Sequence, residues 1–302
     1  MEKFNRAYLL WKYGDSTTIL QQRVINHEER HTITKCCYNQ IKNITYNRKL
    51  GFILIGIILA AGRGQRLSRD VDLKTVGPKC LLTINGYTLL ERMISDLIFF
   101  NVDRINIVVG YKADLVEEAC IILKRKYGAS LKFIHNNDYQ STNTAYSLHI
   151  GLDGIYDDVV IFNGDVLYDY TILRRILELD QTSIVVDNEK MLTDESFKVR
   201  IADGRIEEMG KTIAVENATG EFIGISKVAQ RDLQEAKRLL KILVSENLNN
   251  YYDFIYQSLS KKGVVAYSFT DGLPWTEIDD IHDLIYARSI ADVADGTRGH
   301  IR

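Results

Sequence analysis

The fold of this chain is decided by residues 52–67, FILIGIILAAGRGQRL. The first eight of these residues form a short apolar run rich in Ile, which is typical of a strand buried on both faces. Residues 59–67 then combine small side chains, two glycines and an arginine at 66. Such a backbone can approach a ligand closely, and its amide groups can bind an anion. The stretch therefore predicts a strand that ends at a ligand-binding loop.

Further strands and helices alternate with it along the chain. Buried strands are expected at Ile105–Val109, Leu131–Ile134 and Val159–Phe162, and helices at Leu89–Phe100, Leu115–Tyr127 and Ala145–Leu152. This alternation with short connections predicts an α/β fold, a Rossmann-like mixed, mostly parallel sheet flanked by helices.

The pattern becomes less regular after residue 183. Short strand-like pieces surround several glycines and are expected to form hairpins packed against the first sheet: Ser183–Val186, Lys198–Ile201 and Phe222–Ile225. The remaining expected elements are helices at Ala229–Val244, Tyr251–Lys261 and Ile281–Val293, and a strand at Val264–Phe269.

Residues 1–50 differ in composition from the rest and are expected to form a basic accessory extension. They hold nine Lys or Arg residues against four Asp or Glu residues. Their His27 and His31 make a formal H-E-x-x-H motif, but its β-branched and polar flanks favour a polar surface stretch over a zinc site. A catalytic domain is expected over residues 51–295 and a short tail over residues 296–302.

Composition excludes several classes of protein. With 38 basic and 40 acidic residues the formal net charge is -2, so no nucleic-acid partner is expected. The longest apolar run, residues 51–61, is far shorter than the ~20 residues of a membrane span. None of the four cysteines forms a C-x-x-C pair, which favours a reduced, cytoplasmic location. A homo-oligomer is left open.

Two motifs together narrow the function. The glycine-rich loop lacks the small residue that a dinucleotide fingerprint needs at Leu67, and it lacks the Gly-Lys-Ser/Thr of a Walker loop. Followed about a dozen residues later by Pro78-Lys79, however, it resembles the nucleotidyltransferases that join a nucleoside triphosphate to a phosphorylated acceptor. Later segments resemble the phosphocholine cytidylyltransferase-like branch of that family: residues 143–148, 162–166, 220–225, 250–252 and 272–279.

The resemblance covers roughly residues 55–290 and implies a nucleotide-diphospho-sugar transferase-like fold. It implies transfer of CMP from CTP to a small phosphorylated alcohol or phosphonate similar to choline phosphate, with Mg²⁺ as cofactor and pyrophosphate as product. One alternative is a sugar-1-phosphate nucleotidyltransferase that uses UTP, dTTP or GTP. Another is a non-catalytic, nucleotide-binding regulatory relative, which should have lost at least one of four residues that this chain keeps: Arg66, Lys79, Asp165 and Asp279.

Two carboxylates are the candidate metal ligands. Asp165 follows a buried strand, where open α/β sheets bind ligands, although an Asn-Gly-Asp turn would also use an aspartate there. Asp279 precedes the last helix, where an acidic residue could equally act as a cap. The resemblance favours both as Mg²⁺ ligands, with Glu277 in reserve.

The remaining candidate residues divide by substrate. The resemblance assigns the leaving phosphates to Arg66, and the α-phosphate and the acceptor phosphate to Lys79 and Lys211. The nucleotide is expected at Leu59, Ala60, Ala61, Gly62, Gly64, Asn143, Thr144 and Ser147. Glu221, Tyr251 and Trp275 are expected to contact the acceptor, because they lie in segments that resemble the acceptor end of the family and because aromatic faces can hold an ammonium group.

Overall fold

The computed structural model describes residues 53–71, 77–263 and 265–296. The expected extension, with its His27 and His31 motif, lies outside the described residues, as do residues 297–302. Gly296, expected in the tail, is the last residue of the final helix, α9 (Ile281–Gly296). Among the described residues, no helix is both long enough and apolar enough to cross a membrane.

The predicted parallel sheet is confirmed. Four parallel strands lie in the order β6 (Asp158–Asn163), β1 (Leu54–Ala60), β4 (Arg104–Val109) and β5 (Ser130–His135). The decisive strand β1 pairs with β6 along one edge and with β4 along the other. It is therefore buried on both faces and both edges, which explains its continuous apolar sequence.

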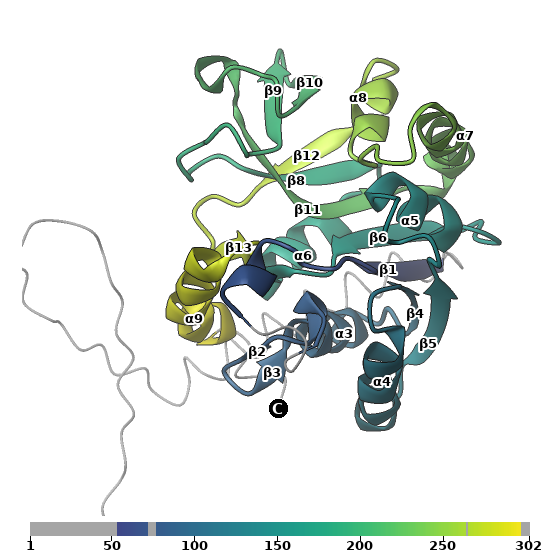
Figure 1. The fold of residues 1–302 in the computed structure, drawn as a ribbon. Helices are drawn as coiled ribbons and strands as arrows, with labels where there is room; N and C mark the ends of the chain where they lie inside the picture. Colours follow the sequence, from purple (N-terminus) through teal and green to yellow (C-terminus); the bar gives the residue numbers. More distant parts are fainter. Residues whose placement is uncertain (1–52, 72–76, 264, 297–302) are drawn as a thin grey trace, which may run out of the picture. The chain divides into compact units, whose positions relative to one another are not determined.

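Helices cover both faces of this half of the sheet (Figure 1). They are α3 (Leu89–Phe99), α4 (Ala113–Tyr127) and α5 (Thr144–Gly151). Gly56 of β1 faces α3 so closely that a Cβ atom there would lie 2.8 Å from Leu97. A Cβ atom on Gly151 of α5 would lie 2.9 Å from Val108 and 3.6 Å from Ile57. Because Gly56 and Ile57 are neighbours on a strand, they point to opposite faces, and α3 and α5 therefore cover opposite faces.

The second half of the chain continues the same sheet. One of the expected hairpins is present, β9 with β10, but these strands extend the first sheet and do not pack against it. The added strands are β8 (Ser183–Asp187), β9 (Lys198–Ala202), β10 (Arg205–Gly210), β11 (Gly220–Val228) and β12 (Ala266–Phe269). Strand β11 joins the two halves of the sheet, because its second half pairs antiparallel with β6 while its first residues pair with β9. Its other edge pairs with β8, with a register shift between Phe222 and Ser226 around Gly224, whose φ is +77°.

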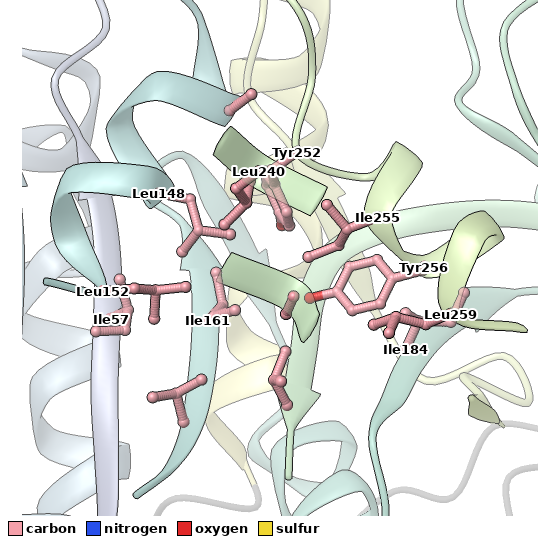
Figure 2. Close-up of a cluster of buried hydrophobic side chains, with 14 of the residues drawn as sticks. Ile57, Leu148, Leu152, Ile161, Ile184, Leu240, Tyr252, Ile255, Tyr256 and Leu259 are labelled. Atoms are coloured by element: carbon pink, nitrogen blue, oxygen red, sulfur yellow. The ribbon is translucent and has the colours of Figure 1, made fainter. Parts of the chain in front are cut away.

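Helices α5, α7 (Gln230–Glu246) and α8 (Phe254–Ser260) pack around a large apolar core. Figure 2 shows Leu148 and Leu152 of α5 beside Ile57 and Ile161 of the sheet, and Tyr256 of α8 above Ile184. The Tyr256 hydroxyl lies 2.6 Å from Ser226 Oγ, which satisfies its polar end inside the core. A fourth helix, α6 (Tyr170–Leu177), packs against β8 and β11.

A two-stranded ribbon lies next to the main sheet. Strand β7 (Val166–Tyr168) follows β6, and β13 (Trp275–Glu277) pairs with it antiparallel. The ribbon brings Glu277, 111 positions later in the chain, opposite Val166. A second short ribbon, β2 (Thr83–Ile84) with β3 (Tyr87–Thr88), leads into α3. The β7–β13 ribbon therefore joins the carboxyl end of β6 to the segment that precedes α9.

Candidate active site

The glycine-rich loop after β1 forms one wall of a cavity of about 470 Å³. The lining includes all eight residues predicted to bind the nucleotide: Leu59, Ala60, Ala61, Gly62, Gly64, Asn143, Thr144 and Ser147. It also includes Arg66, Lys79, Asp165 and Asp279. The cavity lies at the carboxyl ends of β1 and β6, which is where open α/β sheets bind ligands.

Lys79 stands between two carboxylates in this cavity. Its Nζ atom is 2.7 Å from Asp165 Oδ2 and 2.7 Å from Asp279 Oδ1. The second oxygen of Asp279 accepts a hydrogen bond of 2.6 Å from Arg66 Nη2. Pro78, in extended conformation, directs the chain into the short 3-10 turn Lys79–Leu81 that carries the lysine. Four predicted residues from distant parts of the chain thus form one ion-paired cluster.

Glu277 completes the acidic side of the cluster. One carboxylate oxygen from each of Asp165, Glu277 and Asp279 lies within 4.8 Å of the others. The β7–β13 ribbon explains their convergence, since the Ile278 amide donates to the Asp165 carbonyl over 3.0 Å. The amide of Asp279 donates to Asp283 Oδ2 over 2.9 Å, which fixes the backbone before α9. The residue held in reserve therefore lies with the two predicted ligands.

The charged residues of this cluster shift one another's pKa values. Burial alone would lower the pKa of Lys79, but the carboxylates of Asp165 and Asp279 raise it above its ordinary value. Burial opposes ionisation of Asp279 as well, yet Lys79 and Arg66 hold the pKa of that carboxyl below its usual value. Burial, and then the charges of Asp165 and Asp279, raise the pKa of Glu277 well above its usual value.

A close backbone contact between Gly164 and Leu59 fixes the floor of the site. The amide of Gly164 donates to the Leu59 carbonyl over 2.9 Å, which ties the turn before Asp165 to the end of β1. A Cβ atom on Gly164 would lie 2.6 Å from that carbonyl oxygen. The glycine in Asn163-Gly164-Asp165 is thus required by close approach of two strands, and it sets the position of the metal-ligand candidate.

The opposite wall is formed by polar groups at the start of α5. Asn143 caps this helix, accepting from the Thr144 amide over 2.8 Å. Buried Asn136 donates to Ser147 Oγ over 3.1 Å, and the Tyr252 amide donates to Thr144 Oγ1 over 3.3 Å. Short polar side chains held in this way offer fixed hydrogen-bonding groups to a ligand.

The residues predicted for the acceptor do not belong to the lining that the described residues form. They are Lys211, Glu221, Tyr251 and Trp275. Lys211 Nζ is 3.1 Å from Glu195 Oε2, and the Tyr251 ring lies 6.3 Å from that of Phe197. Trp275 is buried on β13, and its ring is approached by an ammonium group of the chain itself, that of Lys190, at 4.9 Å.

Sequence reasoning missed several lining residues, among them Asn136, Tyr139, Gln140 and Thr142. A signal for Asn136 was present, because it directly follows β5, and the carboxyl ends of parallel strands share one edge of a sheet. The others lie on the loop between β5 and α5, whose path no local pattern indicates.

Comparisons with known proteins agree with this geometry. Residues 56–240 match the family model of the MobA-like NTP transferase domain. The chain is 27% identical to the bifunctional IPC transferase and DIPP synthase of Aquifex aeolicus over 253 residues, which cover 80% of this chain and 54% of that protein. It is 37% identical to the choline-phosphate cytidylyltransferase of Haemophilus influenzae over 116 residues, or 38% and 46% of the two chains.

A solved structure is similar over most of its length. The CTP:phosphocholine cytidylyltransferase of Streptococcus pneumoniae superposes with a TM-score of 0.64 and 26% identity, covering 79% of this chain and 99% of that one. The chain spans about half of the length of the two curated relatives named above. The residues matched by the family model, 56–240, contain the glycine-rich loop.

Proposed function

The chain belongs to the MobA-like NTP transferase family, and from this premise we propose that it transfers CMP from CTP to a small phosphorylated alcohol or phosphonate. The observation that carries the proposal is the cluster in which Lys79 and Arg66 meet Asp165 and Asp279 beside the glycine-rich loop. Cationic side chains bind phosphate oxygens, and neighbouring carboxylates bind the divalent cation that accompanies a nucleoside triphosphate.

In the proposed reaction an oxygen of the acceptor phosphate or phosphonate forms a bond to the α-phosphorus of CTP. The bond from that phosphorus to the bridging oxygen breaks, and pyrophosphate leaves with the electron pair. The acceptor is already ionised near neutral pH, so the chain has no proton to remove. Its contribution is to position both phosphates and to stabilise their charge.

Each cation has a task in this scheme. Lys79, which is mostly buried, would contact the α-phosphate where charge develops. Arg66 presents a planar guanidinium, which suits the oxygens of the leaving pyrophosphate, and the loop amides of Gly62 to Gly64 would bind the same group. Lys211 would reach the acceptor phosphate.

The acidic residues fit a magnesium ion. Asp165, Glu277 and Asp279 offer three carboxylate oxygens within 4.8 Å of one another, and Mg²⁺ prefers such hard oxygen ligands. We propose that Asp165 and Asp279 hold Mg²⁺, with Glu277 beside them. When bound, the ion would act as a Lewis acid and as a template for the phosphates of both substrates.

The choice of CTP has two supports. The segments at residues 143–148 and 272–279 resemble the cytidylyltransferase branch. The Haemophilus and Streptococcus proteins named above are both cytidylyltransferases by name. In this chain, Asn143, Thr144 and Ser147 would read the base through hydrogen bonds.

The test is pyrophosphate release from CTP, UTP, GTP, ATP and dTTP with a panel of phosphorylated acceptors. We expect CTP to react at least tenfold faster than the others, a preference that needs only about 1.4 kcal/mol. The acceptors should include choline phosphate, ethanolamine phosphate, 2-aminoethylphosphonate, glycerol 3-phosphate and glucose 1-phosphate. Equal use of UTP or dTTP with the sugar phosphate would assign the chain to the sugar branch, and no release with any pair would identify a non-catalytic relative.

A further inference from the structure

Lys190 places a positive charge beside the predicted acceptor residues. It lies on the loop between β8 and β9, and its Nζ atom is 4.9 Å from the centre of the Trp275 ring. The same atom is 3.9 Å from Glu221 Oε2. An aromatic face and a carboxylate around one ammonium group form the kind of site that binds ammonium ligands. In this chain the ammonium group that fills it is Lys190.

The position of Lys190 is fixed by its backbone. Its amide donates to Asp187 Oδ2 over 2.8 Å. Asp187 is buried, and its other oxygen accepts from the Thr270 hydroxyl. The loop is thereby tied to the ends of β8 and β12, so the lysine side chain starts from a defined point and extends toward Trp275.

The carboxylate of Glu221 stabilises the Lys190 ammonium in this position. Its Oε2 atom is buried and has no hydrogen-bond donor among the described residues. The carboxylate side chain is 13% exposed, and the Lys190 ammonium is the cation beside it. A buried carboxylate oxygen without a partner is costly, so the nearby ammonium stabilises it.

This arrangement lies next to the proposed reaction centre. Trp275 and Glu277 are two residues apart on β13, so their side chains share a face and their positions differ by about 7 Å along the strand. Glu277 lies with Asp165 and Asp279. An acceptor whose phosphate sits at these carboxylates would extend its other end toward Trp275 and meet Lys190.

We propose that Lys190 determines acceptor specificity by occupying the head-group position with its own ammonium, so that the chain selects acceptors with uncharged, hydroxylated head groups. The proposal rests on the function proposed above and narrows it. A cationic head group would meet a like charge or would have to displace Lys190 from Glu221, whereas hydroxyl groups can accept hydrogen bonds from its Nζ atom. Lys190 therefore selects between acceptors by repelling those with a cationic head group.

The activity test compares wild type with Lys190→Met, which keeps the length of the side chain but removes its charge. The matched control is Lys241→Met, because Lys241 is exposed on α7. The measured quantity is kcat/KM with CTP for glycerol 3-phosphate and for choline phosphate. We expect wild type and the control to favour glycerol 3-phosphate at least tenfold, and Lys190→Met to shift the ratio at least tenfold toward choline phosphate. A wild-type preference for choline phosphate, or equal ratios in both variants, would overturn the proposal.

A binding test separates this proposal from the proposed function. Trp11 and Trp275 are the two tryptophans of the chain, so a Trp11→Phe background reports on Trp275 alone. Tetramethylammonium is titrated into this protein with and without Lys190→Met while Trp275 fluorescence is followed. We expect at least tenfold tighter binding without the lysine, whether or not any acceptor reacts. Equal affinity in the two proteins would overturn the role of Lys190, while absence of turnover with every acceptor would count against the proposed function alone.

Discussion

The ammonium group of Lys79 lies 2.7 Å from Asp165 Oδ2, so a residue predicted to hold phosphate is paired with a residue predicted to hold metal. The same ammonium lies 2.7 Å from Asp279 Oδ1. A divalent cation bound as proposed above would therefore compete with the Lys79 ammonium for the same carboxylates, and substrate phosphates would compete with the carboxylates for Lys79. This exchange would link metal binding to nucleotide binding.

The first prediction concerns Lys79→Met. Removing the ammonium should raise the affinity of the free protein for Mn²⁺, used as a spectroscopic substitute for Mg²⁺, by tenfold or more. Turnover should fall on the order of 10²-fold, because a cation at the reacting phosphate is lost. Electron paramagnetic resonance of Mn²⁺ measures the first effect, with Lys241→Met as the control. Unchanged or weaker Mn²⁺ binding would show that the lysine does not compete with the metal.

Asp165→Asn and Asp279→Asn give the second prediction. Each change keeps the size of the side chain but removes a charge, and turnover should fall on the order of 10²-fold. The losses should not add in the double variant, since both residues serve one site. Near-normal activity in either single variant would contradict the assignment.

Stability of these variants follows from the contacts of Lys79. From the sequence alone, two facing carboxylates are expected to repel each other, so either substitution should lower stability little or even raise it. With the ammonium of Lys79 between them, each single substitution should instead lower stability, by about 1 kcal/mol for a partly exposed pair. Melting curves of both single variants, recorded without divalent cations, measure this effect.

Asp253 provides a prediction about pH. Burial raises its pKa to about 7, far above the value of about 3.9 in an unfolded chain. Between these two pH values the folded state keeps a proton that the unfolded state has released, so this group makes stability fall as pH rises from about 4 to about 7. Asp253→Asn, which remains neutral, should therefore melt at a higher temperature than wild type at pH 8. The two should melt at similar temperatures near pH 4, and a variant that is less stable at pH 8 would contradict this account.

Gly164→Ala tests the contact between β1 and the turn before Asp165. The new methyl group would lie 2.6 Å from the Leu59 carbonyl oxygen, so the two backbone segments must separate. We expect a loss of stability of about 1–3 kcal/mol, as for overpacked core positions, together with lower turnover because Asp165 moves. Gly62→Ala is the stability control, since its added Cβ would meet nothing within 4 Å. Equal melting temperatures for the two variants would show that the turn can move away from β1 without a loss of stability.

The sequence predicted the parallel half of the fold well because its inner strands β1, β4 and β6 are buried on both faces. Runs such as those of β1 and β6 contain few polar residues and end at clear turns. Helix α6 was missed although Asp169 caps it and Ile172, Leu173 and Ile176 form its buried face. It has only eight residues and follows β7 after a single residue, so no loop separates the two patterns.

The antiparallel half was harder because its pairing is not local. Strand β11 pairs with three other strands, and the shift at Gly224 that permits this leaves no distinct pattern in the sequence. The site was predicted from resemblance and from strand ends, which gave Lys79, Asp165 and Asp279. The contact of Lys190 with Trp275 could not be predicted, because it depends on the path of the loop that Asp187 fixes.

Strand β6 belongs to both halves of the sheet, since it pairs with parallel β1 on one edge and with antiparallel β11 on the other. Most residues proposed for the nucleotide lie on the β1 side of this seam, whereas Lys190 and Glu221 lie on the β11 side. Substitutions on the β11 side can therefore change the acceptor residues without changing the nucleotide residues on the β1 side. A descendant of this gene could acquire a new acceptor through changes near β8 and β11 while inheriting its nucleotide chemistry intact.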